Sequence, residues 1–118
     1  MKHFFLTLVF LASPGSVVFS QSIDKPIQQL LSKFCLDCHD SETQKGDLDL
    51  ERFGTVADIA ADSKVWEHVL HQIHDGEMPP KKKPQFSNAE RELFTGWVQR
   101  TLDEIALANA GDPGPVVL

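Results

Sequence analysis

Cys35 and Cys38, the two cysteines of the 118-residue chain, lie in the stretch KFCLDCHDS, and His39 follows directly. Two thiols and an imidazole at this spacing can bind a metal, form a redox pair or attach a haem. A zinc site requires four ligands, so distant histidines would have to complete it. A thioredoxin-like redox pair normally lies beside a βαβ pattern, which this sequence lacks. Cys-x-x-Cys-His is the attachment signature of haem c, and we favour that interpretation.

The order of the three residues suits covalent attachment of a haem. Cys35 and Cys38 are spaced to form thioethers with the two vinyl groups on one edge of a porphyrin. His39 is then carried under the iron, where an imidazole serves as the proximal ligand. The sequence therefore predicts one covalently bound haem c, held by these three residues.

A second axial ligand is predicted in DGEMPPKK, where Met78 is followed by Pro79 and Pro80. Methionine sulfur is a common sixth ligand of electron-carrying haems. The prolines restrict the loop that carries it, so less entropy is lost on folding. A methionine that merely fills a gap in a core is the other interpretation, but a polar, proline-rich loop has little core to fill. Met78 is the predicted distal ligand, and displacement by His74 is the alternative.

His68, His71 and His74 recur every three residues. On a helical wheel they fall opposite the apolar face of their segment, which predicts a solvated helix side. A surface copper or zinc site formed by a pair of them is the alternative.

The chain is acidic, with a net charge of −6 and a sequence pI of about 5.2. Nucleic acid and anionic lipid are poor partners for such a protein, because both bind through basic residues. One basic cluster stands out, Lys81, Lys82 and Lys83, directly after the proposed ligand loop. Such a run is usually solvated, but it can also steer an acidic redox partner toward the haem.

Three segments are predicted to form the helices that position these residues. SIDKPIQQLLSKF, with Asp24 as its cap, runs directly into the cysteines. DSKVWEHVLHQIHDG precedes the methionine loop, and SNAERELFTGWVQRTLDEIALANA begins with a Ser87/Glu90 capping box. Their apolar stripes are Ile27, Leu30, Leu31 and Phe34; Val65, Trp66, Val69, Leu70 and Ile73; and Leu93, Phe94, Trp97, Val98, Thr101 and Ile105. Residues 40–62 are predicted as a loop with one helical turn at most, and the fold class is all-α.

Residues 1–20 have the pattern of a secretory signal peptide. Lys2 precedes the apolar run FFLTLVFLA, and small residues in VFS precede Gln21. A retained membrane anchor is the alternative, although the run is short for a membrane span. The predicted organisation is a signal peptide at 1–20, one domain at 21–110 and a linker or tail at 111–118. The product is expected to be periplasmic or otherwise extracytoplasmic, without membrane insertion after cleavage.

The chain resembles the planctomycete-type cytochrome c domain, a small relative of class I cytochromes c. The resemblance rests on the order of its segments: CLDCH, GDLDL, a tryptophan-bearing helix, DGEMPP and a second tryptophan-bearing helix. The resemblance covers about residues 24–108. It implies a compact fold of three main helices around one covalent haem, with Cys35 and Cys38 attached and His39 and Met78 as axial ligands. Lys45 replaces one of the paired glycines usual before the L-x-L motif. Such domains often open larger exported proteins, so the chain is either a free carrier or a module.

These features together predict a non-enzymatic carrier of single electrons, because two filled axial positions leave no site for a substrate. One alternative is a haem domain with a labile sixth ligand, which acts as a peroxidase or a gas sensor. His74 and Glu77 are the acid–base groups nearest to Met78 in sequence for such chemistry. Another alternative is an electron relay within a larger exported enzyme. The expected partner is a redox protein.

Overall fold

The computed structural model describes Val9 and residues 21–110. Its elements are α1 (Lys25–Phe34), α2 (Leu36–His39), the 3₁₀ helix η1 (Lys45–Asp47), α3 (Val56–Ala61), α4 (Ser63–His74) and α5 (Asn88–Ala110). The described residues contain no strand, only an isolated bridge between Ser22 and Thr55. The predicted all-α class is confirmed. The predicted signal peptide and the predicted tail lie outside the described residues, apart from Val9.

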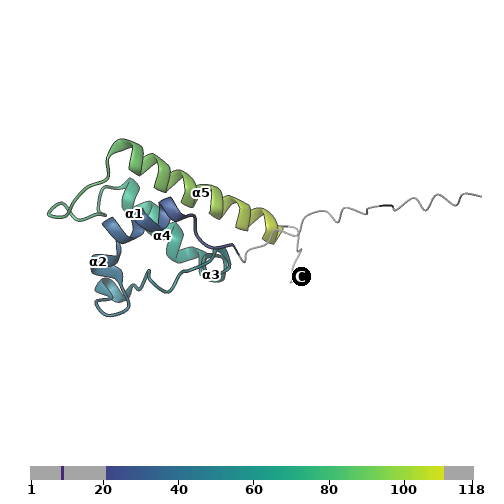
Figure 1. Ribbon diagram of the computed structural model, residues 1–118, viewed down its shortest axis with the longest axis horizontal. Coiled ribbons are helices and arrows are strands. Elements are labelled where there is room, and N and C mark those ends of the chain that lie inside the picture. Colours follow the sequence, from purple (N-terminus) through teal and green to yellow (C-terminus); the bar gives the residue numbers. More distant parts are fainter. Residues whose placement is uncertain (1–8, 10–20, 111–118) are drawn as a thin grey trace, which may run out of the picture.

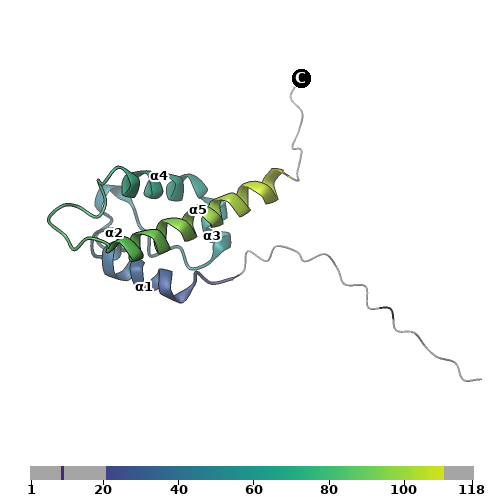
Figure 2. The same ribbon diagram turned by 90° about the horizontal axis from the view of Figure 1, so that it is seen from above.

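Helices α1, α4 and α5 form the framework of the fold (Figure 1). Helix α5 packs on α1, α3 and α4, while α2 packs on α1 and η1. Seen from above, α1 and α4 lie on opposite sides of α5 (Figure 2). In the described part of the chain, no helix combines the length and the apolar character needed to cross a bilayer.

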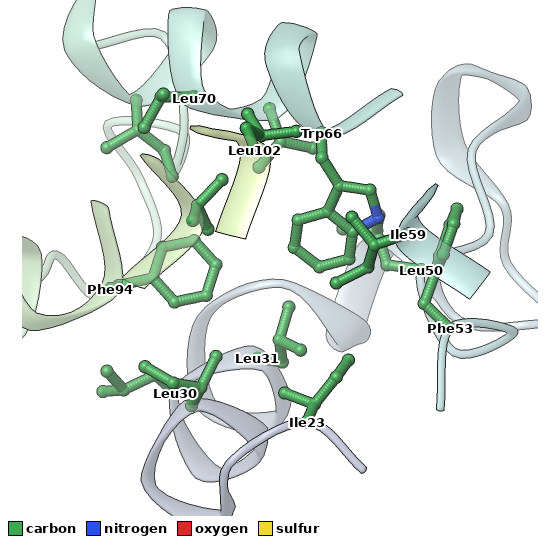
Figure 3. Packing of buried hydrophobic residues seen from close by; sticks show 14 of the residues in the cluster. Ile23, Leu30, Leu31, Leu50, Phe53, Ile59, Trp66, Leu70, Phe94 and Leu102 are labelled. Carbon is green, nitrogen blue, oxygen red and sulfur yellow. The ribbon is translucent and has the colours of Figure 1, made fainter. Parts of the chain in front are cut away.

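The core lies between these helices and is made of aliphatic and aromatic side chains (Figure 3). Its members are Ile23, Ile27, Leu30, Leu31, Leu50, Phe53, Ile59, Trp66, Val69, Leu70, Ile73, Phe94, Val98, Leu102 and Ile105. Trp66 and Phe94 are completely buried, and the edge of Phe53 meets Trp66 with ring centroids 5.3 Å apart. The predicted stripes of α1 and α4 supply much of this core.

The predicted stripe of α5 is wrong at one position. Leu93 is 48% exposed, and Leu102 is buried in the core instead. The buried seam of α5 runs through Phe94, Val98 and Leu102, which are four residues apart and therefore share one helix face. Leu93 lies in the neighbouring row with Trp97 and Thr101, and this row is covered only further along the helix, where Trp97 is half-buried and Thr101 is buried.

The two predicted helix starts have different outcomes. The capping box of α5 is confirmed, because Glu90 N donates to Ser87 Oγ (3.1 Å) and Ser87 N donates to Glu90 Oε1 (3.0 Å). Asp24 precedes α1 as predicted, but its carboxylate does not cap the helix. The carboxylate instead accepts a hydrogen bond from Trp97 Nε1 at 3.1 Å. This bond joins the start of α1 to the middle of α5.

Residues 40–62 contain more helix than the sequence pattern predicted, namely η1 and α3. Helix α3 begins at a capping box, in which Asp58 N donates to Thr55 Oγ1 (3.2 Å) and Thr55 N donates to Asp58 Oδ2 (2.9 Å). Ile59 is the residue of α3 that is buried. A helix this short, with one apolar anchor, gives too little periodicity to be recognised in the sequence.

Candidate functional site

A cavity of about 540 Å³ opens between α2, η1, α4 and the segment that links α4 to α5. Its volume lies within the range of roughly 300–1,000 Å³ that is typical of small-molecule and cofactor sites. Helices α2 and α4 both line it but do not pack on each other, since α2 contacts α1 and η1 while α4 contacts α3 and α5. The cavity therefore separates these two helices.

Cys35, Cys38 and His39 all line this cavity. Cys35 lies between α1 and α2, where its N–H donates to Leu31 O (2.9 Å) and closes the last turn of α1. His39 N donates to Cys35 O (3.1 Å), so the histidine returns one turn after the first cysteine. The single turn of α2 thus brings both thiols and the imidazole to the same wall.

Met78 lines the same cavity from the segment that follows α4. That helix ends at His74, and Gly76 then adopts a φ of 74°, a left-handed conformation that favours glycine. Met78 N donates to Gln72 O at 3.2 Å, which ties the start of the segment to the last turn of α4. Two segments far apart in sequence therefore bring the four predicted haem-binding residues to one cavity.

The remaining lining combines apolar walls with a charged mouth. The buried or half-buried apolar members are Phe34, Leu48, Leu50, Val65, Val69, Ile73, Pro79, Pro80 and Phe86. The charged members are exposed: Lys33, Asp37, Lys45, Asp47, Lys64 and Lys83. Such a lining suits a mainly apolar ligand that has a polar edge facing water.

The chemistry of the donor groups fits a haem. Both cysteines are free thiols, and Met78 supplies a thioether. His39 Nδ1 is buried without a hydrogen-bond partner in the described structure. Buried side-chain nitrogens are nearly always paired, so this orphaned atom marks an imidazole whose surroundings are incomplete without a further group. The residues present therefore fit a haem, because two thiols, an imidazole and a thioether line the same cavity.

Burial raises the pKa of the Cys35 thiol from 9.0 to about 12. The thiol of the folded chain is therefore protonated at neutral pH. Because the thiolate is the reactive form, Cys35 is a poor nucleophile once it is packed against the core.

A zinc or copper site has no ligand set in the described residues, where no three His, Cys, Asp or Glu side chains gather around a common point. His71 pairs with Asp75 on the exposed surface, with Nε2 and Oδ2 2.9 Å apart. All three histidines of the row on α4 are exposed, as their spacing predicts, although His68 also lines the cavity.

The acid–base group that the structure places at the cavity is not one of the two that are nearest to Met78 in sequence. His74 and Glu77 do not line the cavity, whereas His68 does. Residues four apart share one face of a helix, so Lys64 and His68 form one row and Val65 and Val69 form the next. Both rows line the cavity. The position of His68 next to those two valines is the signal that reveals it as a cavity residue.

The basic cluster after Met78 is exposed, and one of its members reaches the cavity. Lys83 lines the mouth, and its Nζ pairs with Asp37 Oδ2 at 2.9 Å. The hydrogen bond and the charge of Asp37 raise the pKa of Lys83. Lys81 and Lys82 have no ion-pair partner within the part of the chain that the structure describes.

This fold and this site describe a small all-α domain with a cofactor-sized cavity that is lined by two cysteines, a histidine and a methionine. Residues 35–82 match the family model described as Planctomycete cytochrome C. The match begins at the first cysteine and extends past Met78, and it confirms the predicted resemblance for this part of residues 24–108. It indicates a cytochrome c domain, a class that binds haem and transfers electrons. Searches of curated proteins and of solved structures gave no match to this chain.

Proposed function

We propose that this chain is an exported c-type cytochrome that carries single electrons through one covalently attached haem. The observation that supports this function is the convergence of Cys35, Cys38, His39 and Met78 on one apolar cavity. The cysteines would form the two thioethers, while His39 and Met78 would be the proximal and distal iron ligands. When bound, the haem supplies an iron centre that gains and loses one electron.

The other lining residues would exclude water from the site. Leu50, Val69 and Ile73 are buried beside the cavity, and the rings of Phe34 and Phe86 meet with centroids 4.3 Å apart. A dry site of low dielectric disfavours the additional positive charge of the oxidised iron. These side chains are therefore expected to raise the reduction potential.

Attachment is proposed to follow export. The signal-like pattern in residues 1–20 supports a periplasmic or other extracytoplasmic location. The chain would use the same haem site whether it is a free electron carrier or an electron-relay module of a larger exported protein.

Optical spectra of the wild type and of Met78→Ala test the proposed ligation. The wild type is expected to be low-spin when oxidised and when reduced, and its ferrous form should not bind carbon monoxide. Met78→Ala removes the thioether, so its ferrous form should become high-spin and bind carbon monoxide readily. Lys82→Ala is the matched control, because this exposed residue belongs to the same segment but does not line the cavity.

The second candidate is a haem domain with a labile sixth ligand, which acts as a peroxidase or a gas sensor. It draws support from the 37% exposure of Met78 and from His68, an acid–base group at the cavity. Rapid binding of carbon monoxide to the wild type, or a high-spin ferrous spectrum, would favour this candidate and contradict the carrier. Identical spectra for the wild type and Met78→Ala would remove Met78 from the proposed ligand set.

A redox partner with an acidic surface is proposed to dock near Lys81, Lys82 and Lys83. Lysines outnumber aspartates at the cavity mouth although the whole chain has a net charge of −6. The basic groups of an otherwise acidic protein thus gather where electrons would leave. Complementary charges raise association rates, and added salt screens them.

Charge reversal at Lys81 and Lys82 tests this docking surface and leaves the Lys83–Asp37 pair intact. We expect Lys81→Glu/Lys82→Glu to slow electron exchange with an acidic redox protein by roughly tenfold at low salt, and to flatten its salt dependence. Lys25→Glu/Arg100→Glu makes the same charge change at exposed positions away from the cavity and serves as the control. Equal effects of the two double variants, or an unchanged salt dependence, would argue against docking at this cluster.

A further inference from the structure

The segment between α4 and α5 carries Met78 and is held by the side-chain amide of Gln85. Gln85 Nε2 lies 3.1 Å from Pro79 O, 2.9 Å from Pro80 O and 3.0 Å from Lys83 O. An amide nitrogen has two hydrogens, so at least one of them is shared between carbonyls. Pro79 and Pro80 directly follow Met78 and lack N–H groups, so this stretch has few donors with which to order itself.

The backbone is fixed on both sides of Met78. On the preceding side, Gln72 O accepts hydrogen bonds from Glu77 N (2.9 Å) and Met78 N (3.2 Å). On the following side, Gln85 binds the carbonyls of the next two residues. Only the side chain of Met78 is left without such a constraint, and it points to the cavity that it lines.

The backbone of Gln85 is held in place because the next residue, Phe86, packs against the core. The ring of Phe86 lies 4.3 Å from that of Phe34 and 5.6 Å from that of Phe94, measured between centroids. Phe94 is completely buried. The position of the Gln85 backbone is therefore set by core packing and does not depend on the exposed loop.

The same group of contacts reaches the cysteines. Lys83, whose carbonyl accepts from Gln85, donates its Nζ to Asp37 Oδ2 at 2.9 Å. Asp37 stands between Cys35 and Cys38. A continuous chain of polar contacts thus joins the residues that follow Met78 to the turn that holds both thiols.

We propose that Gln85 is a positioning residue that keeps the Met78 thioether at the cavity. This inference rests on the proposed function, because it takes Met78 as the distal ligand. Gln85 is exposed and adds little to the core, so its removal frees the loop without unfolding the domain. Without the amide donors, Pro79 O and Lys83 O turn to water, Pro80 O keeps only the bond from Lys83 N (2.8 Å), and the proline segment swings away from the cavity more often.

The test compares variants of the haem-loaded protein at position 85. Gln85→Met keeps the length of the side chain but has no donor, and Gln85→Glu presents acceptors to the three carbonyls. Both are expected to weaken the sulfur-to-iron charge-transfer absorption of the oxidised form and to speed carbon monoxide binding to the reduced form by about tenfold. Gln85→Lys restores a donor of similar reach and should return both values toward the wild type. Gln99→Met is the control, since that exposed amide bonds to Asp103 on α5.

Hydrogen exchange separates positioning from a general loss of stability. We expect faster exchange in Gln85→Met of the Lys83 amide, whose N–H donates to Pro80 O at 2.8 Å, while the amides in the middle of α5 and the denaturation midpoint stay unchanged. A lowered midpoint with uniformly faster exchange would overturn the positioning role. A wild-type spectrum without the sulfur-to-iron absorption would refute Met78 ligation itself. A wild type with this absorption, together with unchanged Gln85→Met and Gln85→Glu variants, would refute only the role of Gln85.

Discussion

Replacing both Cys35 and Cys38 by serine is expected to abolish covalent attachment of haem to this chain. Serine has nearly the size of cysteine, but its hydroxyl is not a thiol and supplies no sulfur for a thioether. The wild type, matured in a host that attaches haem c, should retain its haem on a denaturing gel, whereas Cys35→Ser/Cys38→Ser should carry none. Each single variant keeps one thiol and should retain a weaker haem signal.

Asp37→Ser is the matched control for this experiment, because it lies between the two cysteines and leaves both thiols in place. Its haem should survive denaturation as in the wild type. A colourless wild type in which both thiols react with an alkylating reagent after maturation would contradict covalent attachment, and with it the proposed function.

Phe94→Ala is expected to be among the most damaging changes in the core, with a loss of about 3–5 kcal/mol in the free energy of unfolding. Phe94 is completely buried and stacks on Phe86, which in turn meets Phe34 beside Cys35. The change would open a void behind one wall of the cavity. Because small domains are stable by only about 5–15 kcal/mol, this loss removes much of the stability.

Leu93→Ala provides the comparison, since Leu93 precedes Phe94 on the same helix but is 48% exposed. Its free energy of unfolding should stay within roughly 0.5 kcal/mol of the wild-type value. Denaturant titration of the haem-loaded proteins, followed by far-UV circular dichroism, measures both changes. Similar losses in the two variants would contradict the buried seam assigned to α5.

The contacts around Met78 explain how a small domain can position a proposed iron ligand that lies on an exposed loop. The loop has no packed core of its own, and its prolines cannot donate hydrogen bonds. The backbone carbonyl of Gln72 in α4 binds the residues before the prolines, and the side chain of Gln85 binds the residues after Met78. Phe86 then packs against Phe34 and Phe94. The proposed ligand is thus positioned by polar contacts within the loop and by packing at its end.

Local features of this protein were readable from the sequence. Cys35, Cys38 and His39 lie within five consecutive residues, so their spacing alone predicts that they lie on a single turn. The Ser87/Glu90 capping box is equally local and is present as predicted. The all-α class follows from apolar residues repeated at helical spacing, because that spacing requires a buried helix face.

Contacts between distant segments were decided by the tertiary structure. That Met78 lines the same cavity as His39 depends on how α4 and α1 pack against α5, and no local pattern encodes this packing. Asp24 bonds to Trp97 instead of capping its own helix for the same reason. The physical difference is that hydrogen bonds and periodicity within a helix depend on neighbours a few residues away. The meeting of helices depends on the summed packing of the whole core.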